Sequence, residues 1–257
     1  VGLRSILVVF QFATSIILII STFVIYHQMQ FILHKDLGFD KDQVMLIQGT
    51  HTIGSEIKNF KQELLKLPSV KAVSVSDFLP VAGTKRNGNT FWKEGKTKVD
   101  NGVGGQFWYV DNHYIKTLGL PLAGRINFSA VMPSDSQAVV INQKMADMLN
   151  LKDPVGKRIT NGYDILAVIG VLQDFHYESL RDPIGPLCMR LGNSPTMLSV
   201  KIKTTDMRKS IASINSVWKS FAPSQPIRYT FLDERFAKMY ADVERTARIF
   251  SSFALLA

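Results

Sequence analysis

Residues Ser5–Tyr26 read SILVVFQFATSIILIISTFVIY and contain no charged side chain. The hydrocarbon core of a bilayer takes about 20 apolar residues in a helix, and the backbone there must hydrogen-bond to itself. A secretory signal peptide has a shorter apolar region, about 7–15 residues, followed by a small-residue cleavage site. Here the run is longer and HQMQF follows it. The sequence therefore predicts a transmembrane helix, with its connector, over residues 1–37.

Charged residues are segregated along the chain. Of 30 Lys and Arg and 21 Asp and Glu, a single residue, Arg4, precedes Lys35. An apolar head therefore leads into a body of ordinary soluble composition, which argues against a purely cytosolic protein. Positive charge marks the cytoplasmic flank of a membrane span, so Arg4 indicates that the body is extracytoplasmic.

The remaining composition excludes several classes of function. The net charge is +9, but Lys and Arg are scattered and diluted by acidic and apolar residues. We therefore expect a solvated basic surface and no nucleic-acid partner. The single cysteine, Cys188, excludes an internal disulfide and a zinc site built on several thiolates.

The last stretch of the chain carries one continuous apolar stripe. Its positions recur every three or four residues, as on one helix face; they are Leu232, Phe236, Tyr240, Val243, Ala247 and Phe250. We predict one stiff helix over 232–257, of about 26 residues and about 39 Å, that couples the soluble body to the membrane. The alternative is a simple anchor with a break near Thr246. Residues 249–257 are uncharged and too short to span, so we expect a piece of a longer membrane protein.

Strand and helix patterns alternate at both ends of the body. VMLI at 44–47, an amphipathic helix and VKAVSVSDF at 70–78 form one predicted βαβ unit. A second unit consists of MLSVKIKT at 197–204, a helix over 206–221 and IRYTFL at 227–232. Because the two units are far apart in the chain, they predict one subdomain that is split in sequence.

The predicted fold class is α+β, with four parts. Residues 1–37 form the transmembrane helix and its connector, and 44–76 plus 187–231 form the split βαβ subdomain. Residues 80–186 contain Gly- and aromatic-rich hairpin patterns and further strands, which predict an inserted β-rich subdomain. Residues 232–257 form the connector helix and the start of the next span.

Motifs for catalysis, cofactor binding and metal binding are missing from the sequence. PVGKRI at 154–159 lacks the first glycine and the hydroxyl residue of a P-loop, so nucleotide hydrolysis by that route is not expected. His176 lies between two acids in DFHYESL, but no nucleophile accompanies it, so a packed turn is the better interpretation. We expect no catalytic, cofactor-binding or metal-binding residue, and no enzymatic activity, in this chain.

A series of segments extends over essentially the whole chain. They are LRSILVVFQFATSIILIISTFVIYHQMQFI, KDLGFDKDQVMLI, HYIKTLGLPLAGR, VINQ, PVGKRI, GVLQDFHYESL and TFLDERFAKMYADVERTARIFSSFALLA. In their order and spacing these segments resemble the FtsX/MacB-like permease family of ABC transporters. Gln143 in VINQ departs from the pattern, since many relatives have an acid there.

The resemblance implies a permease subunit that passes ATP-driven motion to an extracytoplasmic core domain, for export or mechanotransmission. It implies a separate ABC ATPase subunit on the cytoplasmic side, a permease dimer, and a periplasmic partner or cargo. The implied location is the bacterial inner membrane, with the main domain in the periplasm. The missing P-loop agrees with ATP hydrolysis in another subunit.

Two other classes of protein have a similar layout. A membrane receptor would bind a small ligand in its extracytoplasmic domain and signal inward through the last helix. A membrane-tethered enzyme would need a convergent polar pocket, of which the sequence shows no sign. Several more apolar spans after Ala257 would indicate a permease, whereas one span and a soluble signalling module would indicate a receptor.

Overall fold

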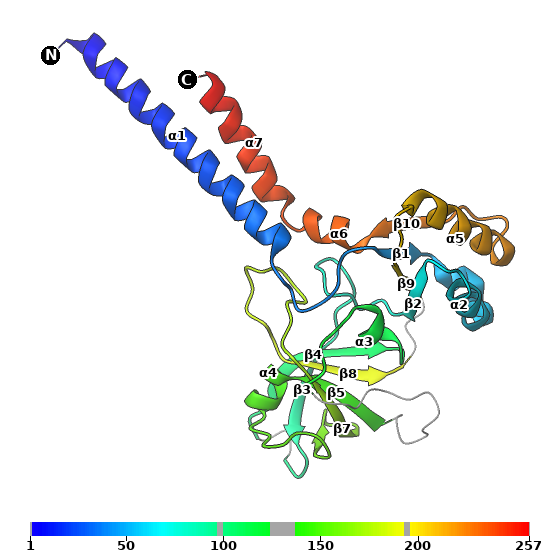
Figure 1. The fold of residues 1–257 in the computed structure, drawn as a ribbon. Helices are drawn as coiled ribbons and strands as arrows, with labels where there is room; N and C mark the ends of the chain where they lie inside the picture. The colour runs from blue at the N-terminus through cyan, green and yellow to red at the C-terminus, as the bar shows by residue number, and fades with distance from the viewer. Residues whose placement is uncertain (1, 97–99, 124–136, 193–195, 257) are drawn as a thin grey trace. The chain divides into compact units, whose positions relative to one another are not determined.

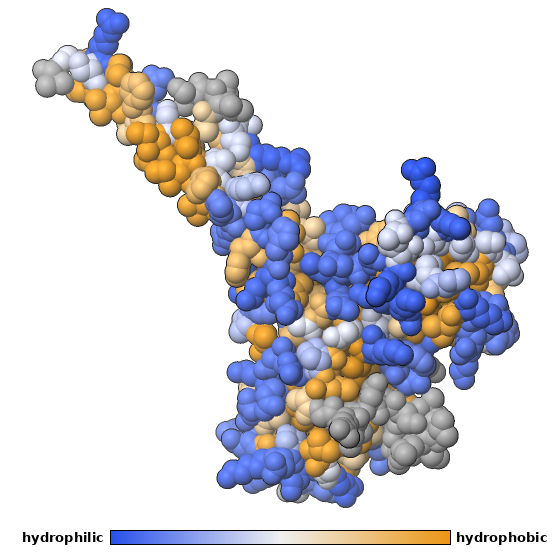
Figure 2. All heavy atoms as spheres, in the orientation of Figure 1, coloured by the Kyte–Doolittle hydropathy of each residue, from blue (hydrophilic) through white to orange (hydrophobic). Residues whose placement is uncertain are grey.

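The computed structural model describes residues 2–96, 100–123, 137–192 and 196–256. The chain forms two compact units, each of which is described by itself. One combines Val1–Asp36 with Phe236–Ala257, and the other is Leu37–Arg235. Figure 2 shows that hydrophobic residues dominate the surface of the first unit, whereas hydrophilic residues cover much of the second.

The first unit is built on the long helix α1, Leu3–His34. By length and composition α1 is able to cross a membrane, with a mean hydropathy of 2.4. Its large apolar side chains are mostly exposed, including Phe10, Phe12 and Phe23. Helix α7, Ala241–Leu256, lies alongside it (Figure 1). The predicted helix is thus present, and its length, hydropathy and exposed apolar side chains suit a membrane span.

The half-buried residues of α1 and α7 each form one stripe. On α1 the stripe is rich in small hydroxyl side chains, and on α7 it contains the predicted apolar positions. The residues are Thr14, Ser15, Leu18, Ser21, Thr22, Ile25, Met29, Gln30 and Leu33 on α1, and Val243, Ala247, Phe250, Ser251 and Ala254 on α7. Small residues allow helix backbones to approach closely in lipid. Ser15 and Ser251 also donate to the carbonyl four residues earlier, which satisfies their hydroxyls inside an apolar setting.

The second unit contains a four-stranded antiparallel sheet. Its strand order is β10-β1-β9-β2. Helices α2 and α5 lie against the sheet (Figure 1). The bounds are β1 Val44–Gln48, a 3₁₀ segment Thr50–Glu56, α2 Ile57–Leu65, β2 Val70–Val75, β9 Met197–Ile202, α5 Met207–Phe221 and β10 Arg228–Phe231.

The two predicted β-α-β segments are interleaved in this sheet. Strand β9 lies between β1 and β2, and β1 lies between β9 and β10. Each helix therefore crosses over one antiparallel strand, which is the ferredoxin-like split βαβ arrangement. A simple pair of neighbouring parallel strands would be the ordinary expectation for a βαβ unit. The local strand pattern carries no information on which strand lies between.

A closed barrel is inserted between β2 and β9. Its strand order is β3-β4-β8-β5-β7-β6. The bounds are β3 Gly88–Lys93, β4 Val103–Val110, α3 Tyr114–Thr117, β5 Ala138–Asn142, α4 Gln143–Met148, β6 Arg158–Thr160, β7 Ile165–Leu172 and β8 Leu187–Leu191. Part of the predicted insert, 124–136, lies outside the described residues.

Strand β8 corrects the predicted boundary at residue 187. The sequence analysis assigned 187–191 to the split βαβ subdomain, but β8 pairs with β4 and β5 of the barrel. The side chain of Asn142 explains how β8 is held there. It accepts from Leu187 N at 2.8 Å and donates to Gly185 O at 2.9 Å. The barrel strands therefore extend over 88–191, and both sheets belong to the same compact unit.

The apolar core of the sheet lies on its helical side. Phe60 of α2 is fully buried, and its ring meets Trp218 and Phe221 of α5 edge-on at 5.8 and 5.3 Å. Met45, Val73 and Val200 are among the strand residues of the same cluster. Together these residues hold α2 and α5 on the sheet.

We expect Phe60→Ala to lower the free energy of unfolding by about 3–5 kcal/mol, because it leaves a cavity under two aromatic rings. Lys58→Ala, on the exposed face of the same helix, should change it by less than about 0.5 kcal/mol. Denaturant unfolding of the full chain in detergent micelles, followed by tryptophan fluorescence, measures both. Equal losses for the two variants would contradict this core assignment.

Candidate functional site

The predicted coupling helix is two helices. Helix α6 spans Leu232–Lys238 and α7 begins at Ala241. A turn at Met239–Tyr240 separates them, so the prediction of one unbroken helix over 232–257 is wrong. The alternative break near Thr246 is also wrong, because Thr246 is inside α7 and its hydroxyl donates to Asp242 O.

Hydrogen bonding and charge explain the position of the turn. Met239 N and Tyr240 N bond to carbonyls three residues earlier, at 3.1 and 3.0 Å, which tightens and closes α6. Tyr240 O then accepts from Val243 N and Glu244 N, which starts α7. Asp242 and Glu244 lie in the first turn of α7, where negative charge favours a helix start. The spacing of the apolar residues alone does not reveal this turn, because it contains no information on backbone hydrogen bonds or on the acidic residues.

The six predicted coupling residues differ in burial along the chain. Leu232, Phe236 and Tyr240 have at most 1% of their surface exposed. Val243, Ala247 and Phe250 are half-buried on α7. The rings of Phe236 and Tyr240 are 5.4 Å apart in an edge-to-face arrangement. The stripe is therefore real as a pattern of burial, although it continues across a turn.

Helix α6 starts directly where β10 ends. Phe231 is the last residue of β10 and Leu232 the first of α6. The carboxylate of Glu234 accepts from Thr230 Oγ1 at 3.0 Å and from Phe231 N at 3.3 Å. Glu234 thus satisfies the Phe231 amide at the start of α6, as the acidic residue of a capping box does.

The connector after α1 has a different construction. Helix α1 ends at His34, four residues before Gly38. Gly38 has φ +78°, a region that favours glycine, and a Cβ there would be 2.8 Å from Phe175 Cβ. Glycine is needed because the connector backbone lies directly on another segment of the domain.

Residues 37–40, 118–120 and 172–176 form what we call the anchor cluster. Leu37 O accepts from His176 N at 3.0 Å, and the rings of Phe39 and Phe175 are 6.4 Å apart. Asp40 N donates to Leu118 O at 2.7 Å. Leu37 and Phe39 are buried. The connector is therefore held by backbone bonds and packed apolar side chains from two distant parts of the sequence.

Ionic and backbone contacts extend the anchor cluster. Lys201 of β9 pairs with Asp40 at 3.2 Å, at an exposed position where such a pair contributes little stability. Gln173 N donates to Pro121 O at 3.0 Å, and Leu122 forms a bridge to Leu172. Lys144 N donates to Asp174 Oδ1 at 2.9 Å, which links the start of α4 to the cluster.

The anchor cluster unites four segments that the sequence analysis treated separately. The segments are KDLGFDKD, LGLPLA, LQDFHY and VINQK. They are spread over more than 100 residues, and the hydrogen bonds above join them in one place. Sequence reasoning missed this convergence, because the segments contain no chemical motif. The available signals were a glycine at position 38, a residue type that tolerates positive φ, and the apolar Phe39 and Phe175 within polar stretches.

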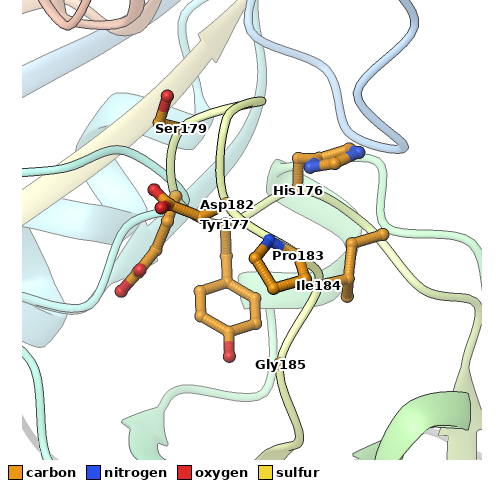
Figure 3. Close-up of a pocket in the computed structure, with 8 residues that line it drawn as sticks. His176, Tyr177, Ser179, Asp182, Pro183, Ile184 and Gly185 are labelled. Carbon is orange, nitrogen blue, oxygen red and sulfur yellow. The ribbon is translucent and has the colours of Figure 1, made fainter.

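His176 does not face a substrate-sized pocket. Figure 3 shows that the rings of His176 and Tyr177 point away from one another. The cavity beside them has a volume of about 10 Å³, enough for at most one water molecule. Burial raises the pKa of Tyr177 to about 12, so its hydroxyl stays protonated at neutral pH. The packed-turn interpretation of DFHYESL agrees with this geometry.

Other potentially reactive groups are buried or already engaged. Cys188 is fully buried, and burial raises the pKa of its thiol, which disfavours the nucleophilic thiolate. A larger cleft of about 310 Å³ is lined by Trp92 and Met148, among others. Near it, Lys93 donates to Asn150 O at 2.7 Å. Within the described part of the chain, no three His, Cys, Asp or Glu residues are grouped as metal ligands.

Comparison with known proteins decides the family. The sequence pattern of the MacB-like periplasmic core domain matches residues 5–209. The chain belongs to this family. The resemblance noted in the sequence is therefore confirmed, and so is the α+β fold class. No curated protein sequence gives a significant match.

Solved structures share the fold at low sequence identity. The periplasmic region of MacB from Actinobacillus actinomycetemcomitans has a TM-score of 0.52 and 13% identity, over 79% of this chain and 94% of that one. The extracellular domain of the noncanonic ABC-type transporter YknZ from Gram-positive bacteria has a TM-score of 0.50 and 16% identity, over 73% and 98%. Together with α1, the family describes a membrane-anchored protein with an extracytoplasmic core domain.

Two glycines separate the contribution of the anchor contact from that of backbone strain. Gly38 and Gly83 both have positive φ, but a Cβ at Gly83 would meet nothing within 4 Å. We expect Gly83→Ala to lower the free energy of unfolding by about 1–2 kcal/mol through strain alone. Gly38→Ala should cost about 1–3 kcal/mol more, because its Cβ collides with Phe175. Denaturant unfolding of both variants measures the difference, and equal losses would show that the connector is not packed on Phe175.

Proposed function

We propose that the chain is a permease subunit of a MacB-type ABC transporter, and that it transmits ATP-driven motion to the extracytoplasmic domain. The observation that carries the proposal is the pairing of β1 with β10. Met45, near the start of β1, is opposite Phe231, at the end of β10. The connector from α1 leads into β1, and α6 continues directly from β10. Both connectors therefore enter one antiparallel strand pair at the same end.

This arrangement suits the transmission of movement. If α1 shifts relative to α7, the displacement is applied to two hydrogen-bonded neighbouring strands. The anchor cluster ties the first connector to β7 and α3, so a displacement of Leu37–Asp40 is also delivered to the barrel. Packed elements move as bodies, because a close-packed interior does not deform continuously.

The partners follow from the same proposal. A separate ABC ATPase on the cytoplasmic side supplies the energy, and this chain carries neither nucleotide chemistry nor a cofactor. The permease acts as a dimer in the bacterial inner membrane, with its main domain in the periplasm. The barrel and sheet then engage a periplasmic partner or cargo. The family match favours this function over a receptor or a membrane-tethered enzyme.

We expect a helix break in α7 to uncouple the domain from ATP hydrolysis. Arg245→Pro with Thr246→Gly interrupts the helix between Val243 and Ala247, since an interior proline costs about 3 kcal/mol. In the assembled transporter in lipid nanodiscs, hydrogen exchange over 37–48 and 228–235 is compared with and without ATP and vanadate. The native transporter should show a nucleotide-dependent difference, and the break variant should lose it while still hydrolysing ATP.

The matched control replaces the same two exposed residues by Ala, which preserves the helix. This variant should keep the nucleotide-dependent difference. A break variant that responds to nucleotide as fully as the native protein would rule out transmission through α7. An absence of any response in the native transporter would refute the proposed function itself.

A further inference from the structure

The carboxylate of Asp111 joins the barrel to the four-stranded sheet. Asp111 directly follows β4 of the barrel. Its partners include Lys61 on α2 and Ser74 and Val75 on β2, which belong to the sheet. Lys61 has 8% of its surface exposed and Ser74 is fully buried. The Lys61–Asp111 ion pair is therefore largely shielded from solvent, with 10% and 18% of the two side chains exposed, whereas ion pairs are weak where both groups are fully solvated.

All the strong acceptor positions of Asp111 are in use. Oδ2 accepts from Lys61 Nζ at 2.6 Å and from Val75 N at 3.0 Å. Oδ1 accepts from Ser74 Oγ at 2.7 Å and from His113 N at 3.1 Å. Removing one partner of a buried ion pair leaves an uncompensated charge, which is strongly unfavourable. The Asp111 carboxylate is therefore stable in this place only while the Lys61 ammonium stays beside it.

His113 places a titratable group beside Lys61. Its Nδ1 is 3.0 Å from Lys61 Nζ, which can only donate, and 2.6 Å from Asn112 Oδ1, which can only accept. One ring nitrogen carries either a lone pair or a proton, so it serves one of these neighbours at a time. When the neutral ring carries its proton on Nε2, Nδ1 accepts from Lys61. In the doubly protonated imidazolium, Nδ1 donates to Asn112 and the charged ring lies beside the Lys61 ammonium.

We propose that Asp111, Lys61 and His113 form an acid-sensitive latch between the sheet and the barrel. At neutral pH Lys61 donates to both Asp111 and His113, and the latch is closed. When a proton from solvent binds His113 Nδ1, the imidazolium repels the Lys61 ammonium, and the sheet–barrel joint loosens. An extracytoplasmic domain is exposed to external pH, so such a latch would respond to acidification.

The electrostatic surroundings of His113 agree with the proposed latch, because they favour the neutral imidazole. Burial lowers its pKa below 6.5, and Lys61 of α2 and Lys116 of α3 lower it further, against the opposing effect of Asp111. The unfolded chain then binds more protons than the folded one at mildly acidic pH. The stability contributed by neutral His113 is therefore complete above about pH 6.5 and is lost as pH falls through the lowered value.

Hydrogen exchange on the full chain in nanodiscs tests the latch. After correction for the intrinsic pH dependence of exchange, amides of 70–77 and 111–117 should exchange faster at pH 5 than at pH 7.5. We expect roughly a tenfold increase for each unit by which folding lowers the His113 pKa. His113→Gln keeps an acceptor for Lys61 but does not titrate, so this variant should lose the acid response.

His51→Gln is the matched control, because His51 is exposed in the same unit; this variant should respond to acid as the native chain does. An identical response in His113→Gln and the native chain would overturn the latch. If His113→Gln fails to fold, an NMR titration of histidine-labelled native chain decides instead. A His113 pKa at or above 6.5 would contradict the proposal, and a lower value would support it.

Discussion

The register that places Met45 opposite Phe231 is the constraint on which the rest of the domain depends. It brings the strand that follows α1 and the strand that precedes α6 into one hydrogen-bonded pair. In the ferredoxin-like order the first and last strands are neighbours, so the chain enters and leaves this sheet at the same place. In a domain with remote entry and exit points, the two connectors would join unrelated strands. Here both connectors continue into the same hydrogen-bonded strand pair. Under the proposed function, displacements passed along the two connectors would act on the same backbone bonds.

The two connectors are secured by different physical means. The first lacks regular structure after His34 and depends on close backbone approach: Gly38 on Phe175, Leu37 O on His176 N, and Asp40 N on Leu118 O. The second is a direct change from strand to helix, fixed by the carboxylate of Glu234. Backbone bonds of this kind each contribute about 0.5–1.5 kcal/mol net. Although each bond adds little free energy, together these bonds fix the connector backbone at defined points of a close-packed domain.

The sequence predicted those features that local patterns encode. The uncharged run before Tyr26, the amphipathic spacing of α2 and α5 and the alternation in β2 and β9 all specify elements. They do not specify partners, so the interleaving of β9 between β1 and β2 and the assignment of β8 to the barrel were missed. The anchor cluster was missed for the same reason, because Gly38 and Phe175 meet only in three dimensions. The break at Met239–Tyr240 was missed because the apolar stripe continues through it, while the acidic residues that start α7 are on the other faces.

The turn between α6 and α7 affects how this connector can resist bending. A continuous helix would resist bending through successive backbone hydrogen bonds, whereas a turn interrupts that ladder. Yet Phe236 and Tyr240 on either side of Lys238 are fully buried and in edge-to-face contact. Burying one such side chain contributes about 1.5–3 kcal/mol, which exceeds the net value of the backbone bond that a turn removes. Packing of these two rings therefore stabilises the turn locally, where the backbone ladder of a helix is missing.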